Sequence, residues 1–232
     1  MTTIDRTMKL IIAGAVLLLA LLPAQSALFT SGTLNQEIPD GNPTGLSSSL
    51  NVSGVAGNVV SLDVYLNISG GYNGDLYVFL SYNNQAAILL NRVGRSLTSP
   101  FGYDDAGFSI VLRDSAATDV HTYGGVNGGM LTGPWQPDGR ATSPQNVLNT
   151  DARTAMLGTF NGMNPNGTWT LFASDMAGGP LGSQSMLENW SLDVNPVPEP
   201  VNVALGAFGL LAGLIAAGRR WFRHRQARCG KS

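Results

Sequence analysis

The clearest pattern in the chain is an alternation of apolar and polar side chains from Val59 to Ile68. The apolar members fall on one face of an extended chain: Val60, Leu62, Val64, Leu66 and Ile68. Because successive side chains of a β-strand point to opposite sides, this period of two predicts a strand with one buried face. The glycine-rich segment Ser69–Gly74 that follows predicts a turn.

Shorter alternating stretches recur along the middle of the chain. They are Asp75–Ser81, Ala87–Leu90, Thr168–Ala173 and Trp190–Val194. No stretch between Leu28 and Pro196 keeps a helical period over three turns, and the glycine-rich segment Thr118–Ala141 is typical of a long loop or a pair of loops. Many short strands joined by turns predict an all-β domain, and more specifically a jelly-roll-like β-sandwich.

The N-terminus has the composition of a secretory signal peptide. Arg6 and Lys9 precede the apolar run Leu10–Leu22, and small residues follow it. The run is shorter than the roughly 20 residues that a membrane span needs, which favours a cleaved peptide over an uncleaved anchor. Cleavage is expected after Ser26 or after Ala27, so the signal peptide is assigned to residues 1–27.

The other end of the chain has an apolar run from Val201 to Ala217, followed by a basic cluster that includes Arg219, Arg220 and Arg223. Arginine stems that snorkel to the interface would extend this run to the length of a single transmembrane helix. Because basic residues stay on the cytoplasmic side, the cluster predicts that the C-terminus remains inside and retains the precursor in the membrane.

Pro198, Glu199 and Pro200 stand directly before this helix. The order of Pro-Glu-Pro motif, helix and arginine-rich end resembles the PEP-CTERM sorting signal of Gram-negative bacteria. The resemblance implies recognition and processing by an exosortase-type membrane protease, and an association with the cell surface or with extracellular polysaccharide. A simple one-span anchor is the alternative. The sorting tail is assigned to residues 196–232, which leaves 28–195 as the exported domain.

Charge and cysteine content narrow the function of that domain. Between Leu28 and Pro196 there are thirteen acidic residues against five arginines and no lysine, a formal charge of −8. Nucleic acid is therefore excluded as an expected partner, since phosphate binding needs a basic surface. The single cysteine, Cys229, lies beyond the predicted helix, so the exported domain has no disulfide.

A second resemblance covers about Glu37 to Val194. The segments that carry it are Ile38-Pro39-Asp40, Gly74-Asp75-Leu76, Leu90-Asn91-Arg92-Val93-Gly94, Phe160-Asn161-Gly162, Gly167-Thr168-Trp169-Thr170-Leu171, Ser174-Asp175 and Trp190-Ser191-Leu192. Their order and spacing are similar to the P domain of proprotein convertases, a jelly-roll β-sandwich that accompanies a protease domain. The chain departs from the family after Asp175, where the turn reads Gly178-Gly179-Pro180 in place of a Gly-Asp turn.

The exported domain lacks the residues of a catalytic site. Its one histidine, His121, is expected to be a solvated loop residue, and no Gly-x-Ser-x-Gly motif accompanies it. The only exported glutamates, Glu37 and Glu188, lie near the two ends of the domain and make a poor pair for glycoside hydrolysis. The chain is therefore expected not to be an enzyme.

Calcium is the most plausible ligand, because loops rich in Asp, Asn and Gly supply the oxygen atoms that it prefers. The candidates are Asp75 with Asn73, Asp104 with Asp105, Asp114 with Asp119, and Asp175; Asp75, Asp114 and Asp175 are the leading three. Turn capping by these same side chains is the competing interpretation.

Four tyrosines offer a second kind of binding surface. Tyr65, Tyr72, Tyr77 and Tyr82 could form an aromatic platform for sugars, although packing across a sheet is the commoner role of strand tyrosines. The sequence predicts a non-catalytic surface or matrix protein. The alternatives are a calcium- or carbohydrate-dependent adhesion module and an accessory partner of a separately encoded protease.

Overall fold

The computed structural model describes residues 26–179, 184–197, 208–209 and 211–215. Gln25–Val197 forms one compact unit. Residues 208–209 and 211–215 are helical. In the described parts of the chain, no helix has the length and hydropathy that a membrane span requires.

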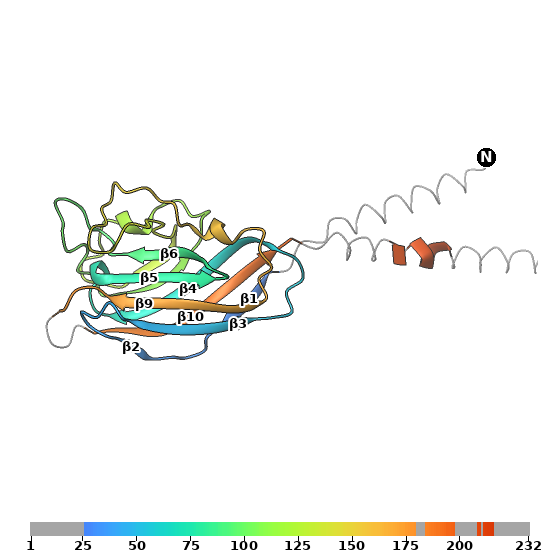
Figure 1. Ribbon diagram of the computed structural model, residues 1–232, viewed down its shortest axis with the longest axis horizontal. Helices are drawn as coiled ribbons and strands as arrows, with labels where there is room; N and C mark the ends of the chain where they lie inside the picture. The colour runs from blue at the N-terminus through green and yellow to red at the C-terminus, as the bar shows by residue number, and fades with distance from the viewer. Residues whose placement is uncertain (1–25, 180–183, 198–207, 210, 216–232) are drawn as a thin grey trace, which may run out of the picture. The chain divides into compact units, whose positions relative to one another are not determined.

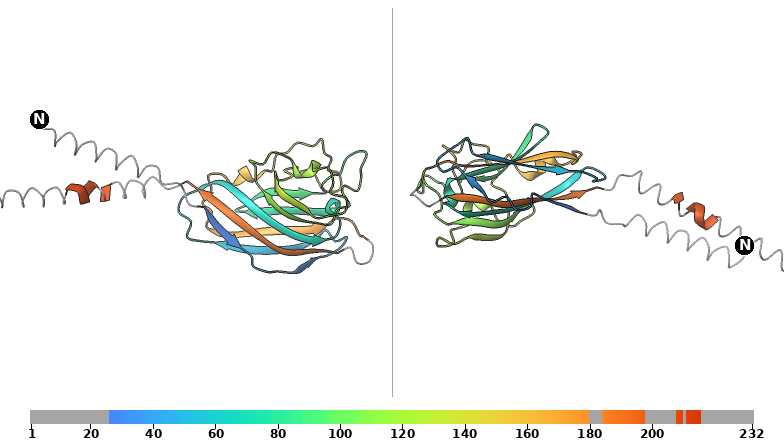
Figure 2. Two further views of the ribbon diagram at one scale, coloured as in Figure 1. Left: turned by 180° about the vertical axis from the view of Figure 1, so that it is seen from behind. Right: turned by 90° about the horizontal axis from the view of Figure 1, so that it is seen from below.

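The first sheet has six strands. Its order is β1 (Ala27–Thr30), β10 (Ser185–Pro196), β4 (Val59–Gly70), β7 (Gly107–Leu112) and β8 (Leu131–Trp135), and β2 (Gln36–Ile38) also pairs with β10. All of these pairings are antiparallel except that between β7 and β8, which is parallel. This sheet faces the viewer in the left panel of Figure 2.

The second sheet has four antiparallel strands. Its order is β3 (Leu46–Val52), β9 (Gly167–Asp175), β5 (Leu76–Tyr82) and β6 (Gln85–Asn91), and it lies in front in Figure 1. Three single turns of 3₁₀-helix occur in the connections: η1 (Asn73–Asp75), η2 (Val120–Thr122) and η3 (Leu157–Phe160). The prediction of an all-β domain with two layers of strands is thus confirmed.

The core between the sheets is built from the inward residues of both. The largest fully buried side chains are Trp169, Trp190, Phe108 and Phe160. Each indole N–H has an acceptor: Trp169 Nε1 donates to Pro165 O at 2.8 Å, and Trp190 Nε1 donates to Ser48 Oγ at 2.9 Å. A buried indole without such an acceptor would be costly, so these two bonds help to fix how the sheets pack.

The alternation along β4 is confirmed from Leu62 onward but is wrong at its start. Val59 is only 2% exposed, whereas Val60 is 47% exposed and points outward. The cause is a bulge: Asn195 pairs with Ser61 but the next residue of β10, Pro196, pairs with Val59. A bulge places an extra residue in one strand, so it reverses the faces of the residues beyond it.

The segment Thr118–Ala141 is more ordered than its composition suggests. It contains η2 and the edge strand β8, and its later part lies against β6. Asp138 N–H donates to Leu89 O at 3.0 Å, and Ile88 N–H donates to Ala155 O at 2.9 Å. The free edge of the second sheet is therefore covered by the long connection between β8 and β9, which protects it from pairing with another chain.

The predicted sorting motif, Pro198, Glu199 and Pro200, and the basic residues Arg219, Arg220 and Arg223 lie outside the described residues. So do residues 1–25 of the predicted signal peptide. Ala27, the last residue of that prediction, is the first residue of β1 and pairs with Val194 of β10.

Candidate functional site

The candidate site lies where β4 passes into β5. Gly70 and Gly71 turn the chain, η1 forms a single helical turn, and Leu76 starts β5. This is the end of the sandwich at which Gly70 pairs with Ser185, opposite the end at which β1 starts and β10 finishes (Figure 1).

Asn73 anchors the turn and is itself fully buried. Its amide group donates to Gly107 O at 3.1 Å and accepts from Gly107 N–H at 2.8 Å, and it also donates to the Tyr123 hydroxyl at 3.1 Å. The side chain therefore holds η1 against β7. Its amide group is already bonded on both sides, and the pairing of Asn73 with Asp75 as metal ligands stays a prediction.

Gly74 brings η1 into direct contact with the loop before β7. A Cβ atom at this position would lie 2.3 Å from Phe101 O and 2.7 Å from Tyr103 N, which leaves no room for a side chain. Gly74 N–H donates to Tyr103 O at 2.8 Å. The glycine thus fixes the position of the loop Phe101–Asp104 relative to Asp75.

Asp75 is the central acidic residue of the site. It is 8% exposed, and its Oδ1 lies 3.3 Å from Arg92 Nη2. Arg92 is held in place by a second bond, from its Nε to Gly74 O at 3.0 Å. The pKa of Asp75 is raised from 3.8 to about 6, mainly by burial and also by repulsion from Asp175, while Arg92 acts in the opposite direction.

Asp175 lies next to Asp75 because β5 and β9 are neighbours: Leu76 pairs with Asp175, and Met176 N–H donates to Asp75 O at 2.8 Å. Asp175 is almost fully buried, and its Oδ1 accepts from Ala177 N–H at 3.1 Å. Burial raises the pKa of Asp175 as well. The structure thus brings together two of the three leading candidates, Asp75 and Asp175.

Asp40 is a third carboxylate near this pair, and it is not among the calcium ligands predicted from the sequence. It follows β2, and its two oxygens accept from Gly179 N–H at 3.0 and 3.2 Å. Its negative charge raises the pKa of both Asp75 and Asp175. Asp40 follows Ile38-Pro39 after β2, and nothing in the local sequence indicates that a residue so far away would meet the other two.

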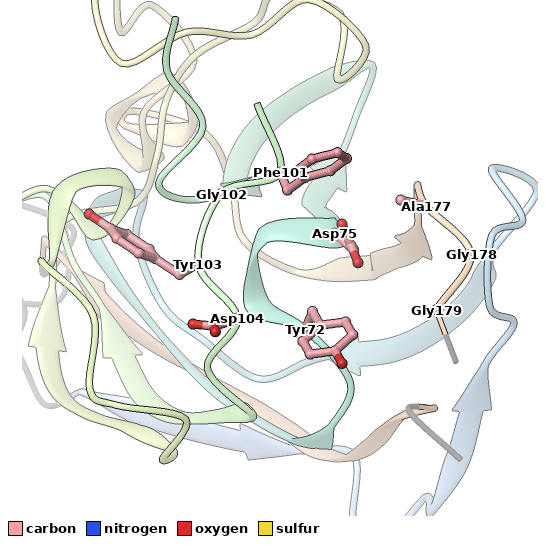
Figure 3. A pocket seen from close by; sticks show the side chains of 9 residues that line it. All are labelled: Tyr72, Asp75, Phe101, Gly102, Tyr103, Asp104, Ala177, Gly178 and Gly179. Carbon is pink, nitrogen blue, oxygen red and sulfur yellow. The ribbon is translucent and has the colours of Figure 1, made fainter. Parts of the chain in front are cut away.

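A hollow of about 270 Å³ opens beside Asp75. It is lined by Tyr72, Asp75, Phe101, Gly102, Tyr103, Asp104, Ala177, Gly178 and Gly179. Figure 3 shows the Asp75 carboxylate between the rings of Phe101 and Tyr72, with the backbone of Ala177–Gly179 on the far side. We refer to this feature as the acidic hollow.

The remaining calcium candidates are separated by the fold. Asp104 is exposed and lines the acidic hollow, but its neighbour Asp105 is buried. Asp105 accepts hydrogen bonds from the Tyr123 hydroxyl at 2.7 Å, from Val126 N–H at 2.9 Å and from Gly128 N–H at 2.7 Å. It therefore organises the loop after η2.

Asp114 and Asp119 also have structural partners. Asp114 accepts from the backbone of η3, at Leu157 N–H and Gly158 N–H, and does not line the acidic hollow. Asp119 accepts from His121 N–H at 2.9 Å and from Arg140 Nη2 at 2.8 Å. Turn capping, the competing interpretation, describes both of these residues.

His121 is not a solvated loop residue, so that prediction was wrong. Its side chain is fully buried. Nδ1 lies 2.7 Å from Asp138 Oδ2 and Nε2 lies 2.9 Å from Arg95 O. The surrounding loop has exposed glycines, but η2 turns its buried face toward β6.

The four tyrosines do not share a surface. Tyr65 is on the outward face of the first sheet, Tyr72 lines the acidic hollow, and Tyr77 packs beside Phe79 on the second sheet. Tyr82 is buried and stacks on Trp169, with ring centroids 4.1 Å apart. These positions do not form one aromatic platform.

A metal site needs several donor side chains close together. Among the described residues, no group of three or more His, Cys, Asp or Glu side chains is arranged to hold a metal ion. The interacting carboxylates Asp75, Asp175 and Asp40 already accept bonds from Arg92, Ala177 N–H and Gly179 N–H. Calcium at Asp75, Asp114 or Asp175 stays a prediction.

No protein-family model matches the chain, and no curated protein matches it. Among solved structures, the chain is similar to the serine protease of Aeromonas sobria, with 17% identity over 75% of this chain and a TM-score of 0.41. The complex of that serine protease with a chaperone gives 17% identity, the same coverage and a TM-score of 0.40. The chain spans 26% of the length of each matched chain. A likeness this distant bears on neither activity nor partner.

Proposed function

We propose that this chain is an exported, non-catalytic binding module with a jelly-roll β-sandwich, which acts at the cell surface or in the extracellular matrix of a Gram-negative bacterium. The observation that carries the binding role is the acidic hollow. It combines a partly desolvated carboxylate, Asp75, with the exposed ring of Phe101 at one end of the sandwich. A concave site with a few convergent polar groups is the usual form of a ligand site.

The absence of catalysis is part of this proposal. A general base has to reach the substrate, and His121 is the only histidine between Leu28 and Pro196. Its burial, with both ring nitrogens bonded inside the protein, supports a structural role. Asp75, whose pKa is raised to about 6, has Arg92 as its neighbour and no nucleophilic Ser, Thr or Cys in the lining of the hollow.

The export route is proposed from the two ends of the sequence. A signal peptide directs the chain across the inner membrane, and the C-terminal helix with Arg219, Arg220 and Arg223 retains the precursor there. An exosortase-type protease then recognises Pro198, Glu199 and Pro200 and releases the domain to the surface or matrix, where extracellular polysaccharide is a candidate neighbour.

A second candidate function is that of an accessory partner of a separately encoded protease. It is favoured by the resemblance of residues 37–194 to the P domain. The acidic hollow supports this candidate too, since carboxylates beside aromatic rings can bind a basic side chain of another protein. Co-purification of the chain with a protease from its own host would favour this candidate over a matrix role.

The experiment that tests the export proposal is the mass and cell fraction of the mature protein from its own host. We expect an N-terminus at Ala27, because cleavage after Ser26 leaves every residue of β1 paired with β10. We expect a C-terminus near 196–200 and a protein found outside the inner membrane. An intact tail in the inner membrane would contradict the sorting proposal and leave an anchored periplasmic domain.

A further inference from the structure

The acidic hollow contains the chemistry needed to recognise an organic cation. We propose that it binds the basic side chain, arginine or lysine, of a protein partner. This inference rests on the proposed binding function and names the chemical class of its ligand.

Negative charge exceeds positive charge around the hollow. Four carboxylates lie in or next to it: Asp40, Asp75, Asp104 and Asp175. The one cation among the described residues that contacts them is Arg92, through Asp75. The site therefore keeps a surplus of negative charge in a partly desolvated position, which an incoming cation would neutralise.

Only one oxygen of the Asp75 carboxylate is paired within the described part of the protein. The Asp75 side chain is 11% exposed, and it lines the hollow. Its Oδ1 is bonded to Arg92, and among the described residues no donor contacts its Oδ2. This oxygen is not among the buried atoms without a partner, so it is open to the hollow, and a ligand N–H directed into the hollow could bond to it.

Aromatic side chains line the hollow next to this carboxylate. Figure 3 shows the rings of Phe101 and Tyr72 on either side of Asp75. The ring of Phe101 is 77% exposed and does not belong to the hydrophobic core. Aromatic faces attract guanidinium and ammonium groups, so an arginine or lysine that reaches Asp75 would also contact a ring.

The same features fit calcium less well. Calcium takes six to eight oxygen ligands, and here Arg92, Ala177 N–H and Gly179 N–H already bond to oxygens of Asp75, Asp175 and Asp40. Aromatic rings supply no ligand to a hard cation. A flat, delocalised guanidinium can instead share a carboxylate with Arg92 while it stacks on Phe101.

The test uses the full-length chain and the peptide acetyl-Gly-Arg-Gly-amide, followed by saturation-transfer NMR. The matching lysine peptide, a citrulline peptide of the same shape without the charge, and free agmatine are the comparison ligands. We expect saturable binding of the arginine and lysine peptides with a Kd on the order of 1 mM, which one ionic and one cation–π contact support. The citrulline peptide should bind at least about tenfold more weakly.

Variants locate the binding. Phe101→Ala should weaken the arginine peptide about three- to fivefold, and Asp75→Asn should weaken it about tenfold or more. Leu97→Ala is the matched control for Phe101→Ala, since Leu97 is 85% exposed in the same connection and does not line the hollow. Asp104→Asn, at an exposed position, removes a charge without disturbing the fold and should weaken binding about two- to threefold.

Several outcomes would overturn the inference. Equal binding of the citrulline peptide would show that charge is not recognised, and tighter binding of agmatine than of the peptide would point to a free amine. Calcium binding that is lost in Asp75→Asn, with no response to either peptide, would replace the basic side chain by a metal but leave the binding function standing. If calcium chloride, the peptides and agmatine all fail to bind, the proposed binding function fails as well.

Discussion

The imidazole Nδ1 of His121 lies 2.7 Å from Oδ2 of Asp138, and both side chains are fully buried. On the other side of the ring, Nε2 lies 2.9 Å from the carbonyl oxygen of Arg95. Each ring nitrogen thus faces an oxygen atom inside the protein, and the ring has no contact left for solvent or a substrate. Asp138 also pairs with Arg140, at 3.2 Å. Both residues lie in the connection between β8 and β9, and together with His121 they form a buried polar cluster.

Replacement of His121 should strongly destabilise the domain. His121→Ala removes one bond from Asp138 Oδ2 and one from Arg95 O, which keep only Asn91 N–H and Asn149 N–H, and it leaves a cavity at a buried position. We expect a loss of about 3 kcal/mol in the free energy of unfolding. Urea denaturation measures this loss. Thr122→Ala, at the exposed neighbouring position, is the control and should change stability by less than about 0.5 kcal/mol. A His121→Ala variant as stable as the control would contradict a structural role for the imidazole.

The raised pKa of Asp75 predicts a pH dependence of stability. Because the folded-state pKa is about 6 and the ordinary value is 3.8, the folded protein binds more protons than the unfolded chain between these two values. Stability therefore falls as the pH rises from about 4 to about 6 and then levels off, by an amount on the order of 2 kcal/mol. Thermal unfolding across this range measures the slope.

Asp75→Asn supplies the control for that measurement, because an amide does not titrate. The variant should lose most of the slope between pH 4 and 6 and keep the smaller one contributed by Asp175, whose pKa burial also raises. An unchanged slope in Asp75→Asn would mean that another group titrates in this range.

Gly74→Ala should distort the site more than its small size suggests. The added Cβ would lie 2.3 Å from Phe101 O, so the loop that carries Phe101 and Asp104 has to move. We expect a loss of about 1–3 kcal/mol in stability, measured by urea denaturation. Gly178→Ala is the matched control, since no atom lies within 4 Å of a Cβ at that position. Equal stability of the two variants would contradict the close packing of η1 on this loop.

The bulge in β4 makes a prediction about two adjacent valines. Val59→Ala removes two buried methyl groups and should cost about 1–2 kcal/mol, whereas Val60→Ala acts at an outward position and should cost less than about 0.5 kcal/mol. A strand without the bulge would give the reverse order. The two unfolding midpoints in urea decide between these registers.

The two-layer β fold could be predicted from the sequence because most core strands carry the period of two. β4, β5, β9 and β10 each contain the expected alternation, and their buried positions follow it from Leu62 onward. The bulge at Val59 depends on the pairing with Pro196, a partner more than a hundred residues away. No local pattern contains that information.

Five strands are not among those predicted from the sequence, β1, β2, β3, β7 and β8, and for β3 and β8 the reason is identifiable. In β3, the inward position Ser48 is polar, which interrupts the apolar alternation; it is tolerated because Trp190 donates to its hydroxyl. In β8, Gly133 and Pro134 are typical of a loop, yet they are accommodated in an edge strand whose only neighbour is β7. By contrast, β7 has Phe108, Ile110 and Leu112 at alternating positions, a signal that was visible in the sequence.

The candidate site was only partly predictable. Asp75 and Asp175 could be selected by residue type and turn context, but their contact follows from the pairing of β5 with β9. Asp40 comes from a third segment and had no local signal. The burial of His121 could not be predicted, because its exposed, glycine-rich neighbours predict solvent, while its burial depends on Arg95 and Asp138 from other segments.

The pairing of the first strand with the last has a mechanical consequence. Ala27 pairs with Val194 and Thr30 with Ser191, so the two ends of the folded domain leave the sheet side by side. A force that pulls these ends apart would load the hydrogen bonds between β1 and β10 one after another, as in a zipper, rather than all at once. The domain should therefore yield at low force when stretched by its ends, with β1 peeling away first and the rest of the sandwich still folded.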